Sequence, residues 1–188
     1  MKTVIFDLDG TLADGTHRLH LLPTVDLHLT DSWTEFNKAS KDDAPFQNNI
    51  DICNALGRSG YFVIILTGRS DVARAETEDW LQRHDVYHNM LKMRSHADNR
   101  KDIIIKEEFL RNVVGLKNVV AAWDDSPEVI RHFRSMGITT YAVCDHGDTT
   151  QRSDLKSHGV EVCSHEWSEP LPPYGEQICN KCGKLRGE

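Results

Sequence analysis

Two aspartates at the end of a short apolar run are the residues of this sequence best suited to chemistry. Asp7 and Asp9 close the run that begins at Val4, and Gly10 and Thr11 follow directly. Side chains alternate along a strand, so residues two apart leave a strand end on the same side. Two hard oxygen ligands there suit Mg²⁺ and a phosphate, and one carboxylate can attack phosphorus while the other handles the leaving group's proton. The alternative is a polar strand end followed by a turn, so the interpretation depends on what else reaches this place.

The elements that must position these carboxylates indicate an α/β protein with a parallel sheet. After the first strand, further strands are predicted at Tyr61–Leu66, 89–93, Val119–Trp123 and Ile138–Val143, and helices at Asn48–Leu56, at Asp71–Arg83, around Asp102–Lys106 and from Ser126. Ligands of such sheets bind where the strands end. An irregular insertion, about residues 23–46, is expected to lie near the site as a small lid.

Two more predicted strands run into polar residues. Thr67, Gly68 and Arg69 supply a hydroxyl, a glycine that permits close backbone approach and a guanidinium, which at the start of a helix would bind an anion. Asp124 and Asp125 are adjacent acids that repel each other, and such a pair favours a bound cation. Three strand ends therefore deliver residues suited to a phosphate and a metal ion.

Basic residues between Lys92 and Lys106 contrast with the net charge of −7, which by itself disfavours nucleic acid as a partner. Asp102 and Lys106 are four residues apart, so they share a helix face, and an ordinary salt bridge is the alternative to a role in the site. Arg18, in a short helix after the first aspartates, is close enough to reach a phosphate, with a solvated helix arginine as its alternative. Cys53 and Cys144 are expected to be buried.

The 188 residues are enough for one substantial core and a small appendage. The longest apolar run, Tyr61–Leu66, is too short to cross a bilayer, and no signal peptide is recognised. We expect a soluble cytoplasmic protein with no membrane association.

Together, the motifs Asp7-Leu8-Asp9-Gly10-Thr11, Thr67-Gly68-Arg69, Lys106 and Asp124-Asp125 resemble those of the haloacid dehalogenase (HAD) superfamily in order and spacing, over residues 1 to about 145. The resemblance implies a Rossmann-like parallel five-stranded sheet, Mg²⁺ and a phosphoaspartyl intermediate. It also implies the roles of the residues. Asp7 would be the nucleophile, Asp9 the general acid that later activates water, Thr67 the phosphate ligand and Lys106 the group that offsets charge on Asp7. Mg²⁺ would be held by Asp7, the Asp9 backbone carbonyl, Asp124 and Asp125.

Within that superfamily, Arg18, Thr67-Gly68-Arg69 and Arg100–Glu108 resemble the phosphatase domain of bacteriophage polynucleotide kinases. This implies that Arg18, Arg69 and Asp102 serve a 3′-phosphatase site, with Gly68 and Arg100 beside the substrate. The sequence departs from that family in two ways. It holds no Gly-x-x-x-x-Gly-Lys-Ser/Thr motif, and its insertion and C-terminal tail are unlike that domain. The resemblance also suggests a phage-encoded protein that acts in the host cytoplasm.

Three of the five cysteines lie in the last 26 residues, which indicates metal binding more than a disulfide framework. Cys163, His165, Cys179 and Cys182 have the spacing of a structural zinc ribbon, with His158 as a substitute ligand and incidental cysteines as the alternative. We expect a phosphatase domain over residues 1–158 and a zinc ribbon over 159–188, whose few apolar residues need the metal to fold.

The leading hypothesis is a Mg²⁺-dependent phosphomonoesterase that acts on a nucleic-acid 3′-phosphate end or on a nucleotide. A 5′-nucleotidase for free mononucleotides is the enzymatic alternative. A non-catalytic module that binds nucleic acid or protein through the ribbon and the basic residues is the alternative of another class. Oligomeric state does not follow from these residues.

Overall fold

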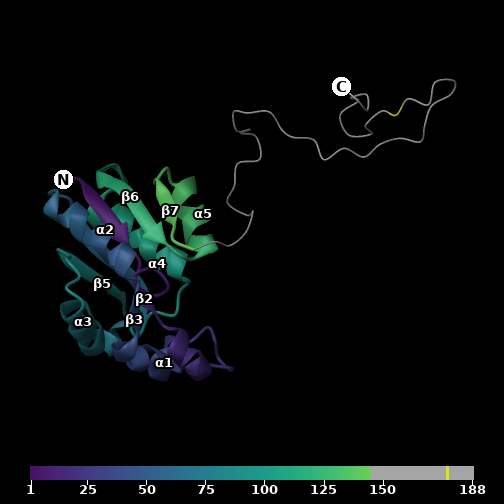
Figure 1. The fold of residues 1–188 in the computed structure, drawn as a ribbon. Helices are drawn as coiled ribbons and strands as arrows, with labels where there is room; N and C mark the ends of the chain where they lie inside the picture. Colours follow the sequence, from purple (N-terminus) through teal and green to yellow (C-terminus); the bar gives the residue numbers. More distant parts are fainter. Residues whose placement is uncertain (145–176, 178–188) are drawn as a thin grey trace. The chain divides into compact units, whose positions relative to one another are not determined.

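A parallel sheet of five strands, in the order β5-β4-β1-β6-β7, forms the centre of the described part of the chain (Figure 1). The computed structural model describes residues 1–144 and residue 177. The strands of this sheet are β1 (Thr3–Phe6), β4 (Phe62–Ser70), β5 (Met90–Arg94), β6 (Val119–Asp124) and β7 (Thr140–Ala142). The predicted α/β fold with a parallel five-stranded sheet is confirmed. The four predicted zinc ligands and the domain boundary at 158/159 lie outside the described residues.

Five α-helices are present in the described part of the chain. They are α1 (Thr34–Lys38), α2 (Gln47–Arg58), α3 (Arg74–Arg83), α4 (Asp102–Phe109) and α5 (Pro127–Ser135). Short 3₁₀ helices cover Thr16–Leu21, Thr30–Trp33, Ala39–Asp42, Asp71–Ala73 and Leu116–Asn118, and a π-helical turn covers Leu110–Val114. None of them is long and apolar enough to span a membrane.

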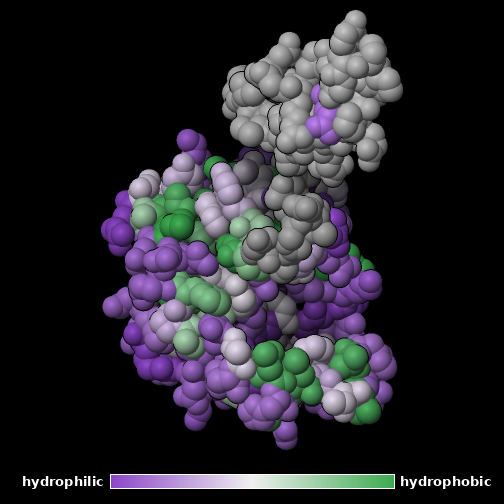
Figure 2. Space-filling model, turned by 45° about the vertical axis from the view of Figure 1, so that its right-hand side comes forward, coloured by the Kyte–Doolittle hydropathy of each residue, from purple (hydrophilic) through white to green (hydrophobic). Residues whose placement is uncertain are grey.

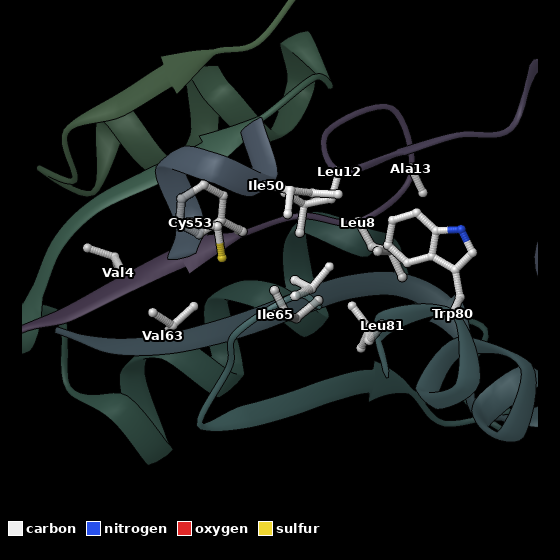
Figure 3. Close-up of a cluster of buried hydrophobic side chains, with 12 residues drawn as sticks. Val4, Leu8, Leu12, Ala13, Ile50, Cys53, Val63, Ile65, Trp80 and Leu81 are labelled. Carbon is white, nitrogen blue, oxygen red and sulfur yellow. The ribbon is translucent and has the colours of Figure 1, made fainter. Parts of the chain in front are cut away.

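Helices cover both faces of the sheet because neighbouring strand residues point to opposite sides. On one face Val4, Val63 and Ile65 pack with α2 and α3, and Figure 3 shows Cys53 of α2 and Trp80 of α3 in this cluster. On the other face α4 and α5 pack against alternate residues of β1, β4 and β6. This two-sided burial explains why residues 4–6 of β1 and 62–66 of β4 are apolar without interruption.

The insertion after the first motif is closed at its base by a second, two-stranded sheet. Strands β2 (Ala13–Asp14) and β3 (Ala44–Pro45) pair antiparallel, with Ala13 opposite Pro45. The segment between them holds α1 and three of the 3₁₀ helices. The insertion is therefore an ordered piece whose two ends are held together beside the end of β1.

Three local predictions are wrong. Thr67 to Ser70 continue β4 instead of opening a helix, and the Ser70 hydroxyl accepts the first hydrogen bond of the 3₁₀ turn from Val72 N at 3.3 Å. The helix predicted to end at Leu56 continues to Arg58, so Gly57 lies inside α2, where a Cβ atom would meet the Tyr87 ring at 2.1 Å. Cys144 is exposed, because the chain leaves the sheet after β7.

Candidate active site

Three neighbouring strands, β4, β1 and β6, bring their polar ends to one edge of the sheet. Asp7 follows β1 directly, and its N–H donates to the carbonyl of Trp123 in β6 at 2.9 Å. Gly10 has a φ of +76°, and a Cβ atom there would lie 2.2 Å from Oδ2 of Asp125. Glycine is required at this turn both for its backbone conformation and for the room that Asp125 takes.

Lys106 lies at the centre of the acidic side of the site. Its Nζ is 2.8 Å from Asp7 Oδ1 and 3.0 Å from both Asp124 Oδ2 and Asp102 Oδ2. Burial alone would lower the pKa of this ammonium, but the three carboxylates together raise it well above its usual value. Lys106 is therefore charged, and the predicted i,i+4 contact with Asp102 is one part of this larger cluster.

Two buried arginines hold Asp9. Arg69 donates from Nη2 to Oδ1 at 2.6 Å and from Nε to Oδ2 at 3.1 Å, and Arg18 Nη2 donates to the same Oδ1. The Arg18 guanidinium also lies 4.0 Å from the centre of the Phe36 ring, and its Nη1 donates to the Phe36 carbonyl. At 1% exposure Arg18 is no solvated surface arginine, because the insertion covers it.

Asp43, which the sequence analysis did not single out, completes this arginine cluster. Its fully buried carboxylate accepts from Arg18 Nε at 2.7 Å, from Arg18 Nη2 at 2.8 Å and from Arg69 Nη2 at 3.1 Å. Its carbonyl accepts from Trp80 Nε1 at 2.7 Å, which ties the site to the core. Asp43 stands next to Asp42 in a polar run, and no local pattern separates the two, so only the tertiary structure reveals it.

The two carboxylates of the first motif have opposite electrostatic surroundings. Burial works against the charge of Asp9, but Arg69 and Arg18 outweigh it and lower the pKa of Asp9 to about 2. For Asp7, burial raises the pKa well above its usual value, and Lys106 offsets only part of that rise. Asp9 is thus firmly ionised, whereas the positive charge near Asp7 does not fully offset the effect of its burial.

Asp124 and Asp125, at the end of β6, also have too little positive charge near them to offset their burial. Burial raises the pKa of Asp124, with Lys106 acting against it, and burial together with the neighbouring Asp124 raises the pKa of Asp125 to about 6. Buried carboxylates that are short of positive charge fit a divalent cation. Among residues 1–144 and 177, no three Asp, Glu, His or Cys side chains form a ready metal cluster. Mg²⁺ in phosphoryl-transfer sites needs only one or two carboxylates besides water and phosphate, so the donor set fits this ion.

A cavity of about 830 Å³ opens over these groups. Nearly all the predicted catalytic and substrate residues line it: Asp7, Asp9, Thr67, Gly68, Arg69, Arg100, Asp102, Lys106, Asp124 and Asp125. Arg18 is absent from the lining because it lies behind Asp9. Arg100 stands at the rim, half-exposed, with ion pairs to Asp98 at 2.6 Å and Glu108 at 2.7 Å.

Gly68 and Arg94 complete the wall beside Asp102. A Cβ atom on Gly68 would lie 2.6 Å from Asp102 Oδ1, so this glycine makes room for the carboxylate. Arg94, which the sequence analysis counted only as a basic residue, donates to the Gly68 carbonyl at 3.0 Å and pairs with Asp102 at 3.4 Å. The Thr67 hydroxyl is buried and accepts from Arg69 N at 3.0 Å.

The comparison with protein families decides the assignment. The model described as the polynucleotide kinase PNKP phosphatase domain matches residues 1–148. The chain belongs to this family. It is a HAD-type phosphatase, a hydrolase of phosphoric monoesters, and the alternative of a non-catalytic module is not supported.

Individual relatives of this PNKP-type phosphatase extend the comparison. A putative bifunctional polynucleotide kinase/RNA ligase of Autographa californica nuclear polyhedrosis virus is 28% identical over 147 residues, which cover 76% of this chain and 19% of the viral protein. A chain in the structure of a Pnkp1/Rnl/Hen1 complex is 29% identical with a TM-score of 0.60, over 76% of this chain and 45% of that one. The present chain thus spans less than half the length of these two relatives.

A HAD family enzyme from Bacteroides thetaiotaomicron, solved with magnesium and inorganic phosphate, has a TM-score of 0.53 at 16% identity, over 80% of this chain and 98% of that one. At this identity the likeness concerns the fold alone.

Proposed function

We propose that this phosphatase removes the terminal phosphate from 3′-phosphorylated nucleic-acid ends, with Mg²⁺ as its cofactor. The observation that carries the proposal is the cavity of about 830 Å³, in which the strand-end groups meet a rim of basic side chains. Such a volume admits a nucleotide. Arg94, Arg100 and Lys101 line the same cavity and suit the phosphates of a strand that continues beyond its end. The PNKP family match supports the same substrate class. So does a related chain, 30% identical to this one, that was solved in the Pnkp1/Rnl/Hen1 RNA repair complex.

The chemistry begins with Asp7, whose carboxylate is placed to attack phosphorus and form a phosphoaspartyl intermediate. Lys106, 2.8 Å away, favours the ionised form of Asp7 and offsets the charge of the transferred group. Thr67 and Gly68 lie at the end of β4, beside the place where the phosphate would bind. Asp7, Asp124, Asp125 and the Asp9 backbone carbonyl are the groups that would hold Mg²⁺, which neutralises charge on the phosphate oxygens when bound.

Asp9 handles protons in both steps. Held by two arginines, it is ionised in the free enzyme and suited to accept a proton from the water that hydrolyses the intermediate. A bound phosphate dianion competes for Arg69, which lines the cavity, and places negative charge beside Asp9, and both effects raise the pKa of Asp9. Substrate binding itself would therefore prepare Asp9 to protonate the leaving oxygen.

The test is phosphate release, with and without Mg²⁺, from a matched panel. The panel holds a 3′-phosphorylated oligonucleotide, its 5′-phosphorylated counterpart, and 3′- and 5′-mononucleotides, with Asp7→Asn as the blank. We expect kcat/KM to be highest, by orders of magnitude, for the 3′-phosphorylated oligonucleotide, and Asp7→Asn to be folded and inactive. A preference for 5′-mononucleotides would instead make the protein a nucleotidase, and turnover by Asp7→Asn would refute the phosphoaspartyl mechanism.

The zinc ribbon is also a proposal, and it rests on the spacing of Cys163, His165, Cys179 and Cys182 alone. Metal analysis of the purified protein should find one zinc ion per chain, and Cys179→Ser should lose it while phosphatase activity persists. Absence of zinc from the wild-type protein would rule the ribbon out.

A further inference from the structure

The cavity has two walls of different chemistry. One wall belongs to the insertion, where Leu27, Leu29 and Trp33 line the cavity. A second wall carries the basic side chains of Arg94 and Arg100 and the segment that leads into α4. An apolar wall contributes nothing to the binding of a phosphate group alone. The cavity therefore suits a substrate that has an apolar part next to its phosphate.

The apolar wall is an ordered surface. The Trp33 indole N–H donates to the Leu27 carbonyl at 3.1 Å, and its ring meets Phe36 edge to face, with centroids 6.0 Å apart. Thr30 fastens the same turn to the basic segment, since its N–H donates to Asn99 Oδ1 at 2.7 Å and its hydroxyl to the Asp98 carbonyl at 2.6 Å. These two hydrogen bonds join the apolar wall to the basic one.

Hydrophobic side chains remain exposed on this part of the molecule. Leu27 is 58% exposed and Leu29 is 36% exposed although both line the cavity. Figure 2 shows hydrophobic residues gathered at the surface toward the end that carries α1 in Figure 1. Exposed apolar residues beside a polar site are typical of a binding surface for a flat, apolar ligand group.

Asn37 provides a second, independent observation. It lines the cavity, and only 6% of its surface is exposed. A side-chain amide in a cavity wall can both donate and accept hydrogen bonds with a polar group of a bound ligand. Asn37 follows Phe36, whose carbonyl accepts from the same Arg18 that contacts Asp9, so this part of α1 lies near Asp9.

We propose that Leu27, Leu29 and Trp33 hold the terminal nucleobase of the substrate and that Asn37 hydrogen-bonds the sugar that carries the scissile phosphate. The proposal rests on the proposed function and assigns the part of the substrate that each wall meets. Base stacking on aromatic and apolar side chains tolerates every base, so we expect dependence on the presence of a base and little dependence on its identity.

The test compares two 3′-phosphorylated oligonucleotides that differ only in their last residue, a normal nucleotide in one and a stable abasic sugar in the other. In the wild-type protein, loss of the terminal base should lower kcat/KM about tenfold. Trp33→Ala and Leu27→Ala should lower kcat/KM for the normal substrate by a similar factor and abolish the difference between the two substrates. Asn37→Ala should lower kcat/KM equally for both substrates, since the sugar is present in each.

Controls separate recognition from folding. Leu27 is exposed enough for its truncation to leave the core intact, and Trp33→Phe should restore part of the base dependence. Tyr141→Ala removes an exposed aromatic side chain outside the cavity and should keep the full wild-type dependence. If Trp33→Ala and Leu27→Ala still respond to base removal as the wild type does, the nucleobase does not bind this wall and the inference is wrong.

The outcome is distinguishable from failure of the proposed function. If the wild-type protein hydrolyses 5′-mononucleotides and not 3′-phosphorylated ends, the proposed function fails. The same comparison is then made with a 5′-mononucleotide and deoxyribose 5-phosphate, and it tests the apolar wall independently.

Discussion

Replacing Asp43 by asparagine removes the charge that holds the two buried arginines together. The Asp43 side chain is fully buried, and those of Arg18 and Arg69 are 1% and 0% exposed. Removing one partner of a buried ion pair typically costs about 3 to 5 kcal/mol, because the remaining charge is left buried without compensation. Asp9 still pairs with both arginines, so we expect a loss at the lower end, about 3 kcal/mol.

Urea denaturation measures this loss. With a slope of about 2 kcal/mol per M, the unfolding midpoint of Asp43→Asn should fall by about 1.5 M. The matched control is Asp79→Asn, which breaks an exposed i,i+4 pair with Arg83 on α3 and should cost less than about 1 kcal/mol. If the two variants shift the midpoint equally, the buried cluster does not stabilise the fold as argued.

Catalysis should suffer as well, because Asp43 orients the two arginines that hold Asp9. In the phosphatase assay, under conditions where the variant is folded, Asp43→Asn should lose at least about tenfold in kcat/KM. A stability loss with unchanged kcat/KM would show that Asp43 supports the insertion and not the geometry of the site.

Three further outcomes follow from single residues. Gly57→Ala should lower the midpoint of urea unfolding, although alanine favours helices, because its Cβ would overlap the Tyr87 ring. An unchanged or higher midpoint would show that this ring moves aside without cost. Burial raises the pKa of the Cys53 thiol to about 12, so iodoacetamide at pH 8 should modify Cys53 only after denaturation. Peptide mass spectrometry measures this labelling, and rapid labelling of the native protein would contradict the burial of Cys53. Gly68→Ala should reduce kcat/KM about 10- to 100-fold, because its Cβ displaces the carboxylate of Asp102, while circular dichroism stays unchanged.

The order of strands and helices was accessible from the sequence because hydrophobic periodicity and end signals are local. The helix predicted from Ser126 is present as α5: Ser126 caps it, with its hydroxyl accepting from Val129 N, and Pro127 stands at its start. The end of α2 was not predictable, because a glycine inside a helix and one that ends it have the same local sequence signal, and only the packing of the Tyr87 ring against Gly57 distinguishes them.

The residues that the motifs supplied were also predictable, since three of the strands that carry them end at the same edge of a parallel sheet. Only the tertiary structure decided which charged groups pair with one another at this sheet edge. Asp43 and Asn37 come from the insertion, whose irregular sequence has no period from which a facing residue could be deduced. Their place depends on β2 pairing with β3 and on Arg18 reaching from Asp9 to the Phe36 carbonyl. Such long-range contacts are set by packing. The sequence by itself therefore determined which candidate site residues meet at this sheet edge, whereas the fold of the insertion decided what surrounds them.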